Sequence, residues 1–203
     1  MLLIFILLIV ILMVLTVFVM VTPHSAIDQY LLVSVQHYDV DILKNTAVVL
    51  AHVGSLYGTS LIAGLLCAVL IYQRRRAQVL QLLVGFFLTV GMTWLLKWLI
   101  ARPRPEAVDP SAVATYGSSF PSAHSAYAAM LAIMLVLVFR SNQTVKYWVW
   151  GVALIWAVLM GWSRIYINAH YATDVLAGWI IAILMMSFSI GLINKFYLNQ
   201  RYQ

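Results

Sequence analysis

The chain has 203 residues, of which 64% are hydrophobic and only 9% are charged. Soluble domains usually carry about 25% charged residues, so this chain has too little polar surface to cover a water-facing globule. Its net charge of +6 comes from short clusters between apolar runs, which argues against a nucleic-acid partner. Its single cysteine, Cys67, excludes an internal disulfide and is interpreted as a buried structural thiol. The composition therefore predicts an integral membrane protein.

Six apolar segments approach the length of about 20 residues that a membrane-spanning helix needs. They are roughly Leu2–Val21, Thr46–Tyr72, Val79–Ile100, Ala123–Phe139, Tyr147–Gly161 and Ala172–Ile193. The first lacks the basic start of a signal peptide and is too long for one, so we interpret it as a span. The stretch Ile27–Val35 is apolar enough to lie along the membrane interface. We predict an all-α fold, a polytopic membrane helix bundle with six transmembrane helices in a single domain over residues 1–203.

The distribution of Lys and Arg predicts the orientation of the chain. If the spans alternate, seven cations share one side, which the positive-inside rule makes cytoplasmic. They are Arg74, Arg75, Arg76, Arg140, Lys146, Lys195 and Arg201. All six acidic residues fall on the other side, together with five cations. Those cations are Lys44, Lys97, Arg102, Arg104 and Arg164. Both termini are therefore expected in the cytoplasm.

Cations on the outer side run against the topology rule and need another explanation. Lys97 lies near the end of the third apolar segment, and Arg102 and Arg104 follow it. Taken alone, Lys97 is explained equally well by a functional role and by snorkelling of its side chain to the interface. The stretch Phe120–Ser125 begins the fourth segment with a Pro-Ser pair, a helix-start signal whose free backbone N–H groups can bind an anion. His124 stands about one turn inside this helix start.

A third polar stretch, Ser163–Asp174, contains His170 and Asp174 four residues apart. If the stretch is helical, the carboxylate shares a face with the imidazole and can accept its hydrogen bond. That pairing leaves the other ring nitrogen free as a nucleophile or base. The alternative is a purely structural His–Asp pair that satisfies the hydrogen bonds of a polar patch. Together the three stretches supply cations, helix-start donors and two histidines, an inventory that suits phosphoryl transfer without a metal. No spacing typical of a zinc site is present.

These three stretches resemble the signature motifs of the type 2 phosphatidic acid phosphatase (PAP2) superfamily, which also includes vanadium haloperoxidases. The matching residues are Lys97 and Arg104-Pro105, then Pro121-Ser122-Ala123-His124, then Ser163-Arg164, His170 and Asp174. The resemblance covers about residues 79–193 and the six-span plan. Ala123 departs from the usual glycine, which keeps the backbone N–H and strains the chain only if that position needs a positive φ.

The resemblance implies a role for each matching residue. His170 would be the nucleophile that forms a phosphohistidine, Asp174 would orient it, and His124 would be the general acid. The phosphate would be bound by Lys97, Arg104, Ser122, the Ala123 N–H and Arg164. Turnover in the family needs no metal, so we expect no metal and no cofactor. Arg102 has no motif position, and we favour a solvated side chain over a contact with a second phosphate or with the lipid surface.

The leading hypothesis is a membrane phosphatase that hydrolyses a lipid phosphate or diphosphate at the outer face of the membrane. Family substrates include phosphatidic acid, phosphatidylglycerol phosphate, undecaprenyl diphosphate and lipid A phosphates, and all are compatible with the sequence. A lipid phosphotransferase is a close variant, and a non-enzymatic transporter of an anionic lipid is the alternative from another class. A haloperoxidase relative fits a fully membrane-embedded plan less well. The compact size favours a bacterial plasma membrane, by analogy.

Overall fold

The computed structural model describes residues 2–36, 40–105, 116–139 and 144–200, and within these ranges the chain forms helices and no strands. The helices are α1 (Leu2–Val21), α2 (Ala26–Gln36), α3 (Asp41–Val53), α4 (Leu56–Tyr72), α5 (Arg76–Ile100), α6 (Ala123–Phe139), α7 (Lys146–Tyr166) and α8 (Ala172–Gln200). The predicted all-α class is confirmed. Five charged residues of the topology prediction lie outside the described ranges, namely Asp39, Glu106, Asp109, Arg140 and Arg201.

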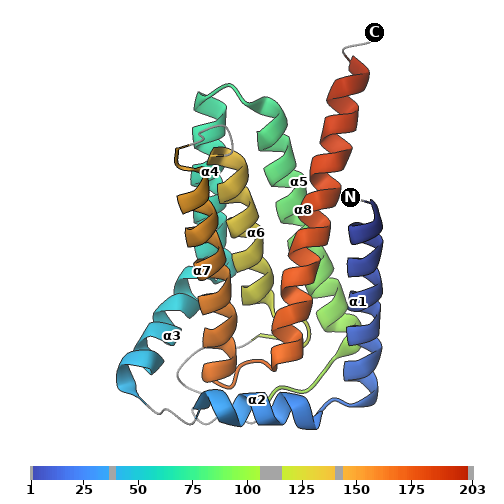
Figure 1. Ribbon diagram of the computed structural model, residues 1–203, viewed down its shortest axis with the longest axis vertical. Helices are drawn as coiled ribbons and strands as arrows, with labels where there is room; N and C mark the ends of the chain where they lie inside the picture. The colour runs from blue at the N-terminus through green and yellow to red at the C-terminus, as the bar shows by residue number, and fades with distance from the viewer. Residues whose placement is uncertain (1, 37–39, 106–115, 140–143, 201–203) are drawn as a thin grey trace.

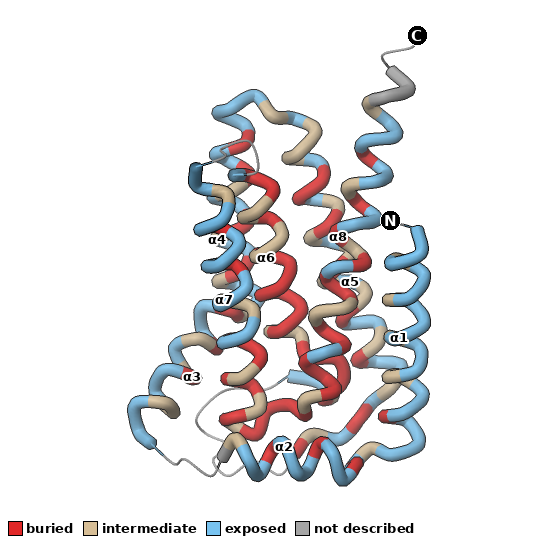
Figure 2. The backbone as a smooth tube through the Cα atoms, in the orientation of Figure 1, coloured by how far each residue is buried: buried red, intermediate tan, exposed pale blue. Residues whose placement is uncertain are grey.

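Helix α6 forms the centre of a bundle with α4, α5, α7 and α8 (Figure 1). It is apolar on every side and rich in alanine near its start, so neighbouring helices can pack closely around it. A buried cluster joins α6 to α4, α5 and α8 and includes Cys67, Leu70, Leu82, Met130, Met134 and Met186. The thiol of Cys67 is thus buried in the core, as predicted. Figure 2 shows that burial is concentrated in α6 and the neighbouring helices, whereas α1 stays exposed along most of its length.

Four or five of the six predicted membrane spans meet the length and apolarity expected of a crossing helix, and one of them is bent. Four helices of the described chain, α1, α5, α7 and α8, are long and apolar enough to cross a membrane, which makes the chain an integral membrane protein. The predicted span Thr46–Tyr72 is not one straight helix, because it covers most of α3 and all of α4, which meet at a bend of 59°. Counting this bent pair as one span gives five, and α6 with its 17 residues is shorter than the others.

The bend between α3 and α4 has a local cause in the sequence. Ser55 adopts an extended conformation, and its side chain accepts a hydrogen bond from the backbone N–H of Gly58 at 3.2 Å. A serine in this role starts a new helix and so separates α4 from α3. The apolar run continues through the bend, which is why hydropathy alone predicts one continuous helix.

Helix α2 lies across one end of the bundle, roughly at right angles to the long helices (Figure 1). It contains the whole stretch Ile27–Val35, which the sequence predicts at the interface. Its buried residues include Asp28 and Leu32, while Tyr30 and Val33 are exposed. The start of α1, the α4–α5 connection and the end of α8 all lie toward the opposite end of the bundle. The start of α1 and the end of α8 therefore lie toward one end of the bundle, and α2 caps the other end.

Candidate active site

The first polar stretch begins in the last turn of α5, near α2. Lys97 is only 4% exposed, and its Nζ donates to the carbonyl oxygens of Ser118 and Ser119 at 2.5 and 3.4 Å. Ala101 ends the helix in the left-handed conformation, with φ of 49°. A left-handed residue reverses the course of the backbone and releases the chain from the helix. Lys97 therefore faces a loop instead of snorkelling to the interface.

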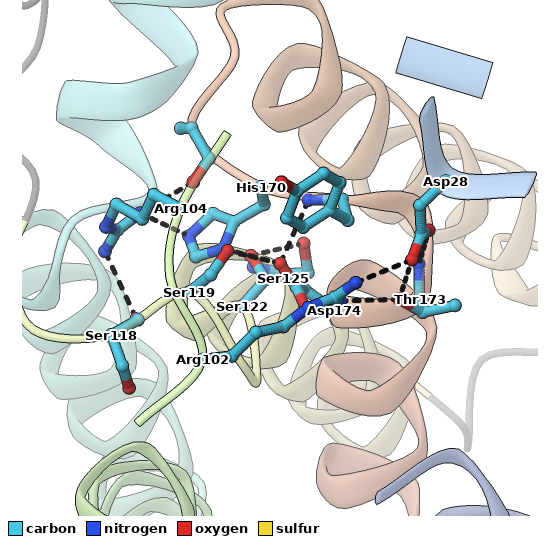
Figure 3. A network of polar contacts seen from close by, with 12 residues as sticks. Asp28, Arg102, Arg104, Ser118, Ser119, Ser122, Ser125, His170, Thr173 and Asp174 are labelled. Atoms are coloured by element: carbon cyan, nitrogen blue, oxygen red, sulfur yellow. Dashed lines mark hydrogen bonds and ion pairs between the residues drawn. The ribbon is translucent and has the colours of Figure 1, made fainter. Parts of the chain in front are cut away.

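Arg104 connects two loops through its guanidinium group (Figure 3). Its Nη1 donates to the carbonyl oxygen of Ala169 at 2.7 Å and lies 3.3 Å from Nε2 of His170. Its other nitrogens donate to the carbonyl oxygens of Tyr116, Gly117 and Ser118. Burial lowers the pKa of Arg104, but a guanidinium group stays charged at neutral pH. Arg104 thus holds a positive charge directly beside the histidine ring.

The start of α6 is fixed by the second polar stretch. Ser122 precedes the helix, and its Oγ accepts from the N–H and the Oγ of Ser125 at 3.4 and 2.9 Å. The N–H of Ser122 donates to the carbonyl oxygen of Asp174 at 3.0 Å, which ties this helix start to α8. Ala123 has no positive φ, so the alanine in place of the usual glycine causes no backbone strain. The N–H groups of Ala123 and His124 begin the helix and have no carbonyl partner within it.

Helix α3 supports two of the predicted site residues through its backbone. Nε2 of His124 lies 3.1 Å from the carbonyl oxygen of Ala51, in the last turn of α3. A carbonyl oxygen only accepts, so this ring nitrogen carries the hydrogen. Nη2 of Arg164 donates to the carbonyl oxygen of Ala47 at 2.9 Å, and the whole residue is 1% exposed. The backbone of α3 therefore positions His124 and Arg164.

The third polar stretch turns sharply between α7 and α8. Ala169 N–H donates to Arg164 O and Asn168 N–H donates to Ile165 O, both at 3.0 Å, and Asn168 has φ of 57°. This is the Schellman pattern that ends helices, with asparagine tolerating the left-handed position. His170 follows the turn and lies before α8, so the stretch is not helical throughout. The turn still places the imidazole beside the first turn of α8.

Asp174 lies in that first turn and is fully buried. Its Oδ2 accepts from Ser119 Oγ at 2.5 Å and from the N–H of Tyr171 at 2.9 Å, and lies 3.5 Å from Nδ1 of His170. The predicted contact between His170 and Asp174 is thus present, but it is longer than the other two. Asp174 is held mainly by groups other than the histidine that it is predicted to orient.

Arg102 is not solvated, so that expectation is wrong. Its side chain is fully buried, and Nη2 pairs with Asp28 Oδ2 at 2.8 Å while Nη1 pairs with Asp174 Oδ1 at 2.6 Å (Figure 3). Nη1 also donates to Thr173 Oγ1 at 2.8 Å, and the guanidinium lies 4.2 Å from the ring centre of Tyr171. A charge removed from water needs such partners, and Arg102 finds one of them on α2.

The protonation state of His170 follows from its surroundings. Burial lowers its pKa well below the usual value; the hydrogen bond to Asp174 raises it, and the nearby charges of Lys97 and Arg104 lower it. The ring is therefore neutral. Arg104 can only donate, so Nε2 is the acceptor and Nδ1 carries the hydrogen toward Asp174. A neutral imidazole with a lone pair on Nε2 beside a cation is able to attack an electrophile that carries negative charge.

Four residues join the site that the motifs did not mark. They are Ser119, Arg102, Asp28 and Thr173. Two of them had a signal in the sequence, because Ser119 directly precedes the second polar stretch and Asp28 is the one charge in α2. Among the described residues, no group of three or more His, Cys, Asp or Glu side chains is placed to hold a metal ion.

Comparison with known proteins identifies the family. A sequence profile of the PAP2 superfamily matches residues 78–197, and the chain belongs to this superfamily. An undecaprenyl-diphosphatase of Sulfolobus acidocaldarius is 30% identical over 116 residues, which cover 55% of this chain and 53% of that protein. Phosphatidylglycerophosphatase B of Bacillus subtilis is 36% identical over 107 residues, which cover 50% and 51%. The chain thus matches about half the length of these curated relatives, which are named as phosphatases.

Two crystal structures share the architecture. A transmembrane PAP2-type phosphatidylglycerolphosphate phosphatase from Bacillus subtilis superposes with a TM-score of 0.81 and 25% identity, over 94% of this chain and 96% of that one. LpxE from Aquifex aeolicus superposes with a TM-score of 0.68 and 23% identity, over 83% and 98%. The helical bundle is therefore a PAP2 fold.

Proposed function

We propose that this chain is a membrane phosphatase that hydrolyses a lipid phosphate or diphosphate through a phosphohistidine at His170. The observation that carries the proposal is the environment of that ring, which is neutral, presents Nε2 to Arg104 and directs Nδ1 toward Asp174. The names of the relatives support the substrate class, since they act on undecaprenyl diphosphate, phosphatidylglycerophosphate, lipid A and dolichyl diphosphate.

In the proposed first step, Nε2 of His170 attacks phosphorus and the bond from phosphorus to the leaving oxygen breaks. The leaving oxygen takes a proton from His124, whose imidazolium form would keep one hydrogen on Ala51 O and deliver the other from Nδ1. Asp174 stabilises the positive ring through Nδ1–H. In the second step His124 removes a proton from water, the water oxygen attacks phosphorus, and inorganic phosphate leaves His170.

Three cations are available for the phosphate oxygens in this proposal, namely Lys97, Arg104 and Arg164. Ser122 Oγ and the N–H of Ala123 complete the proposed cradle at the start of α6. Arg102 is assigned no phosphate, because its nitrogens are already paired with two carboxylates. Negative charge that develops on the phosphoryl group would thus meet preorganised donors in a buried site.

We further propose that the site faces the outside of a bacterial plasma membrane and that both termini are cytoplasmic. The support is the positive charge of Arg74, Arg75 and Arg76, which lie in the α4–α5 connection and at the start of α5, at the end of the bundle opposite α2. In this arrangement α1, α4, α5, α6, α7 and α8 are six crossing helices of a single domain, with α6 a short crossing inside the protein.

Purified protein assayed against a panel of lipid mono- and diphosphates tests the proposal. We expect inorganic phosphate release that His170→Gln lowers by roughly 10³-fold or more, and an acid-labile phosphoenzyme that the His170 variant does not form. The matched control is His52→Gln, which changes an exposed histidine of α3. Wild-type turnover by the His170 variant would refute the phosphohistidine. A phosphorylated alcohol in place of inorganic phosphate would identify a phosphotransferase.

A further inference from the structure

Arg102 lies between two carboxylates that come from opposite ends of the sequence. One is Asp28 on α2, whose Oδ2 lies 2.8 Å from Nη2 of Arg102. The other is Asp174 at the start of α8, whose Oδ1 lies 2.6 Å from Nη1. All three side chains are fully buried. Figure 3 shows the arginine reaching from the α5–α6 loop between them. The ion pair with Asp174 thus continues directly into α2.

Asp28 also binds the backbone at the start of α8. Its Oδ1 accepts from the N–H of Thr173 at 3.1 Å, and its Oδ2 accepts from Thr173 Oγ1 at 2.7 Å. The first N–H groups of a helix have no partner within it, so this carboxylate caps α8 from another helix. Ser25 Oγ, which lies 3.1 Å from Asp28 Oδ2, completes its hydrogen bonds. Asp28 therefore fixes both Arg102 and the helix turn that carries Asp174.

This arrangement divides the two oxygens of Asp174 between two tasks. Oδ1 is occupied by Arg102, so Oδ2 is the oxygen that remains for Ser119 and for Nδ1 of His170. The positive charge of Arg102 also favours the ionised form of Asp174. In that form Asp174 accepts the hydrogen bond from Nδ1–H of His170, and the proton stays on the imidazole. Asp28 in turn offsets part of that positive charge and keeps the guanidinium away from the phosphate cradle.

We infer that Asp28 and Arg102 are positioning residues, which set the orientation and ionisation of Asp174 and make α2 a part of the working site. The inference rests on the proposed function of His170 and Asp174 and adds two residues to it that no PAP2 motif position marks in this chain. Neither residue touches the phosphate in this scheme. Their effect reaches His170 through the position of Asp174 and through their own charges.

The first test measures kcat and KM of Asp28→Asn against the matched control Asp41→Asn, which alters an exposed carboxylate in the first turn of α3. We expect Asp28→Asn to lower kcat by about 10–100-fold, because a small misplacement of a catalytic group has effects of that size. KM should change by less than about twofold, since binding contacts to phosphate are kept. Wild-type kcat in Asp28→Asn would overturn the inference.

The pH profile separates positioning from simple loss of folded protein. His170 is faced by Lys97 on α5, Arg104 in the α5–α6 loop and Asp174 on α8, with Arg102 and Asp28 behind Asp174. Removing the negative charge of Asp28 makes protonation of His170 harder, so the acid limb of kcat/KM should move to lower pH. Arg102→Gln removes a positive charge and should move the limb to higher pH. Two unmoved limbs would contradict the inference.

Two further measurements test the inference if a variant folds poorly or if no substrate is identified. Arg102→Lys keeps the charge but cannot bind both carboxylates, so we expect a lower kcat with the acid limb at its wild-type pH. Hydrogen exchange of residues 167–175 needs no substrate, and Asp28→Asn should accelerate it while Asp41→Asn should not. A wild-type protein that releases no phosphate refutes the proposed function. Unchanged exchange in Asp28→Asn refutes the positioning role, whether or not the protein is a phosphatase.

Discussion

A Cβ atom added at Gly178 would lie 2.6 Å from the carbonyl oxygen of Ser122. The same atom would lie 3.0 Å from the backbone nitrogen of Ala126, so the obstacle is backbone and not a flexible side chain. The absence of a side chain on α8 thus lets the start of α6 approach it closely. This contact sets the position of the N–H groups that we propose to bind phosphate.

Gly178→Ala should therefore push the start of α6 away from α8. We expect kcat/KM to fall by about tenfold or more, because the displaced helix start carries the proposed cradle and His124. Overpacking should also lower stability by about 1–3 kcal/mol. The control is Gly191→Ala on the same helix, where an added Cβ would meet no atom within 4 Å. Equal activity of the two variants would show that the close approach does not matter.

Ser119 gives a second prediction, because its Oγ donates to Asp174 Oδ2 at 2.5 Å and lies 3.5 Å from Nδ1 of His170. A hydrogen bond to a charged group contributes about 1.5–3 kcal/mol, so Ser119→Ala should lower kcat by roughly 10–100-fold if the bond matters most in the transition state. KM should stay near its wild-type value. Ser60→Ala, at an exposed position on α4, is the matched control in the same phosphate-release assay. A rise in KM alone would assign Ser119 to phosphate binding instead.

The lowered pKa of His170 predicts how stability depends on pH. Below about pH 6.5 the unfolded chain protonates this histidine, whereas the folded chain keeps it neutral because burial lowers its pKa. The unfolded state then binds more protons, so the free energy of unfolding decreases as the pH falls below about 6.5. Melting temperatures at pH 7.5 and pH 5 should therefore differ more in the wild type than in His170→Gln. An equal fall in both proteins would mean that the folded chain also protonates His170.

The motif residues could be found from the sequence because each motif is local in the chain. Lys97 and Arg104 share one stretch, and His170 and Asp174 share another, so their spacing carries the information. Arg102 shows the limit of such reasoning, since its partner Asp28 lies 74 residues earlier in the chain. Nothing in the neighbourhood of Arg102 distinguishes a buried cation from a solvated one.

Two other features cannot be read from hydropathy. The break between α3 and α4 is decided by Ser55, a single residue within an apolar run. Arg75 was assigned to topology, yet its guanidinium also donates to the carbonyl oxygens of Leu137 and Val138 at the end of α6. It thereby satisfies backbone acceptors that no helical N–H can reach. A cation that obeys the positive-inside rule can therefore have a structural task that the rule does not reveal.

The orientation in the membrane can be tested by thiol labelling of intact cells, in a Cys67→Ser background that removes the one native thiol. Ser34→Cys lies on the exposed side of α2, at the end of the bundle with the site, and Arg74→Cys lies in the exposed α4–α5 connection at the other end. If the site faces outward, an impermeant maleimide should label the Ser34 variant in intact cells. It should label the Arg74 variant only after permeabilisation. Equal labelling of both in detergent is the control for reactivity, and the reverse pattern in cells would place the site on the cytoplasmic side.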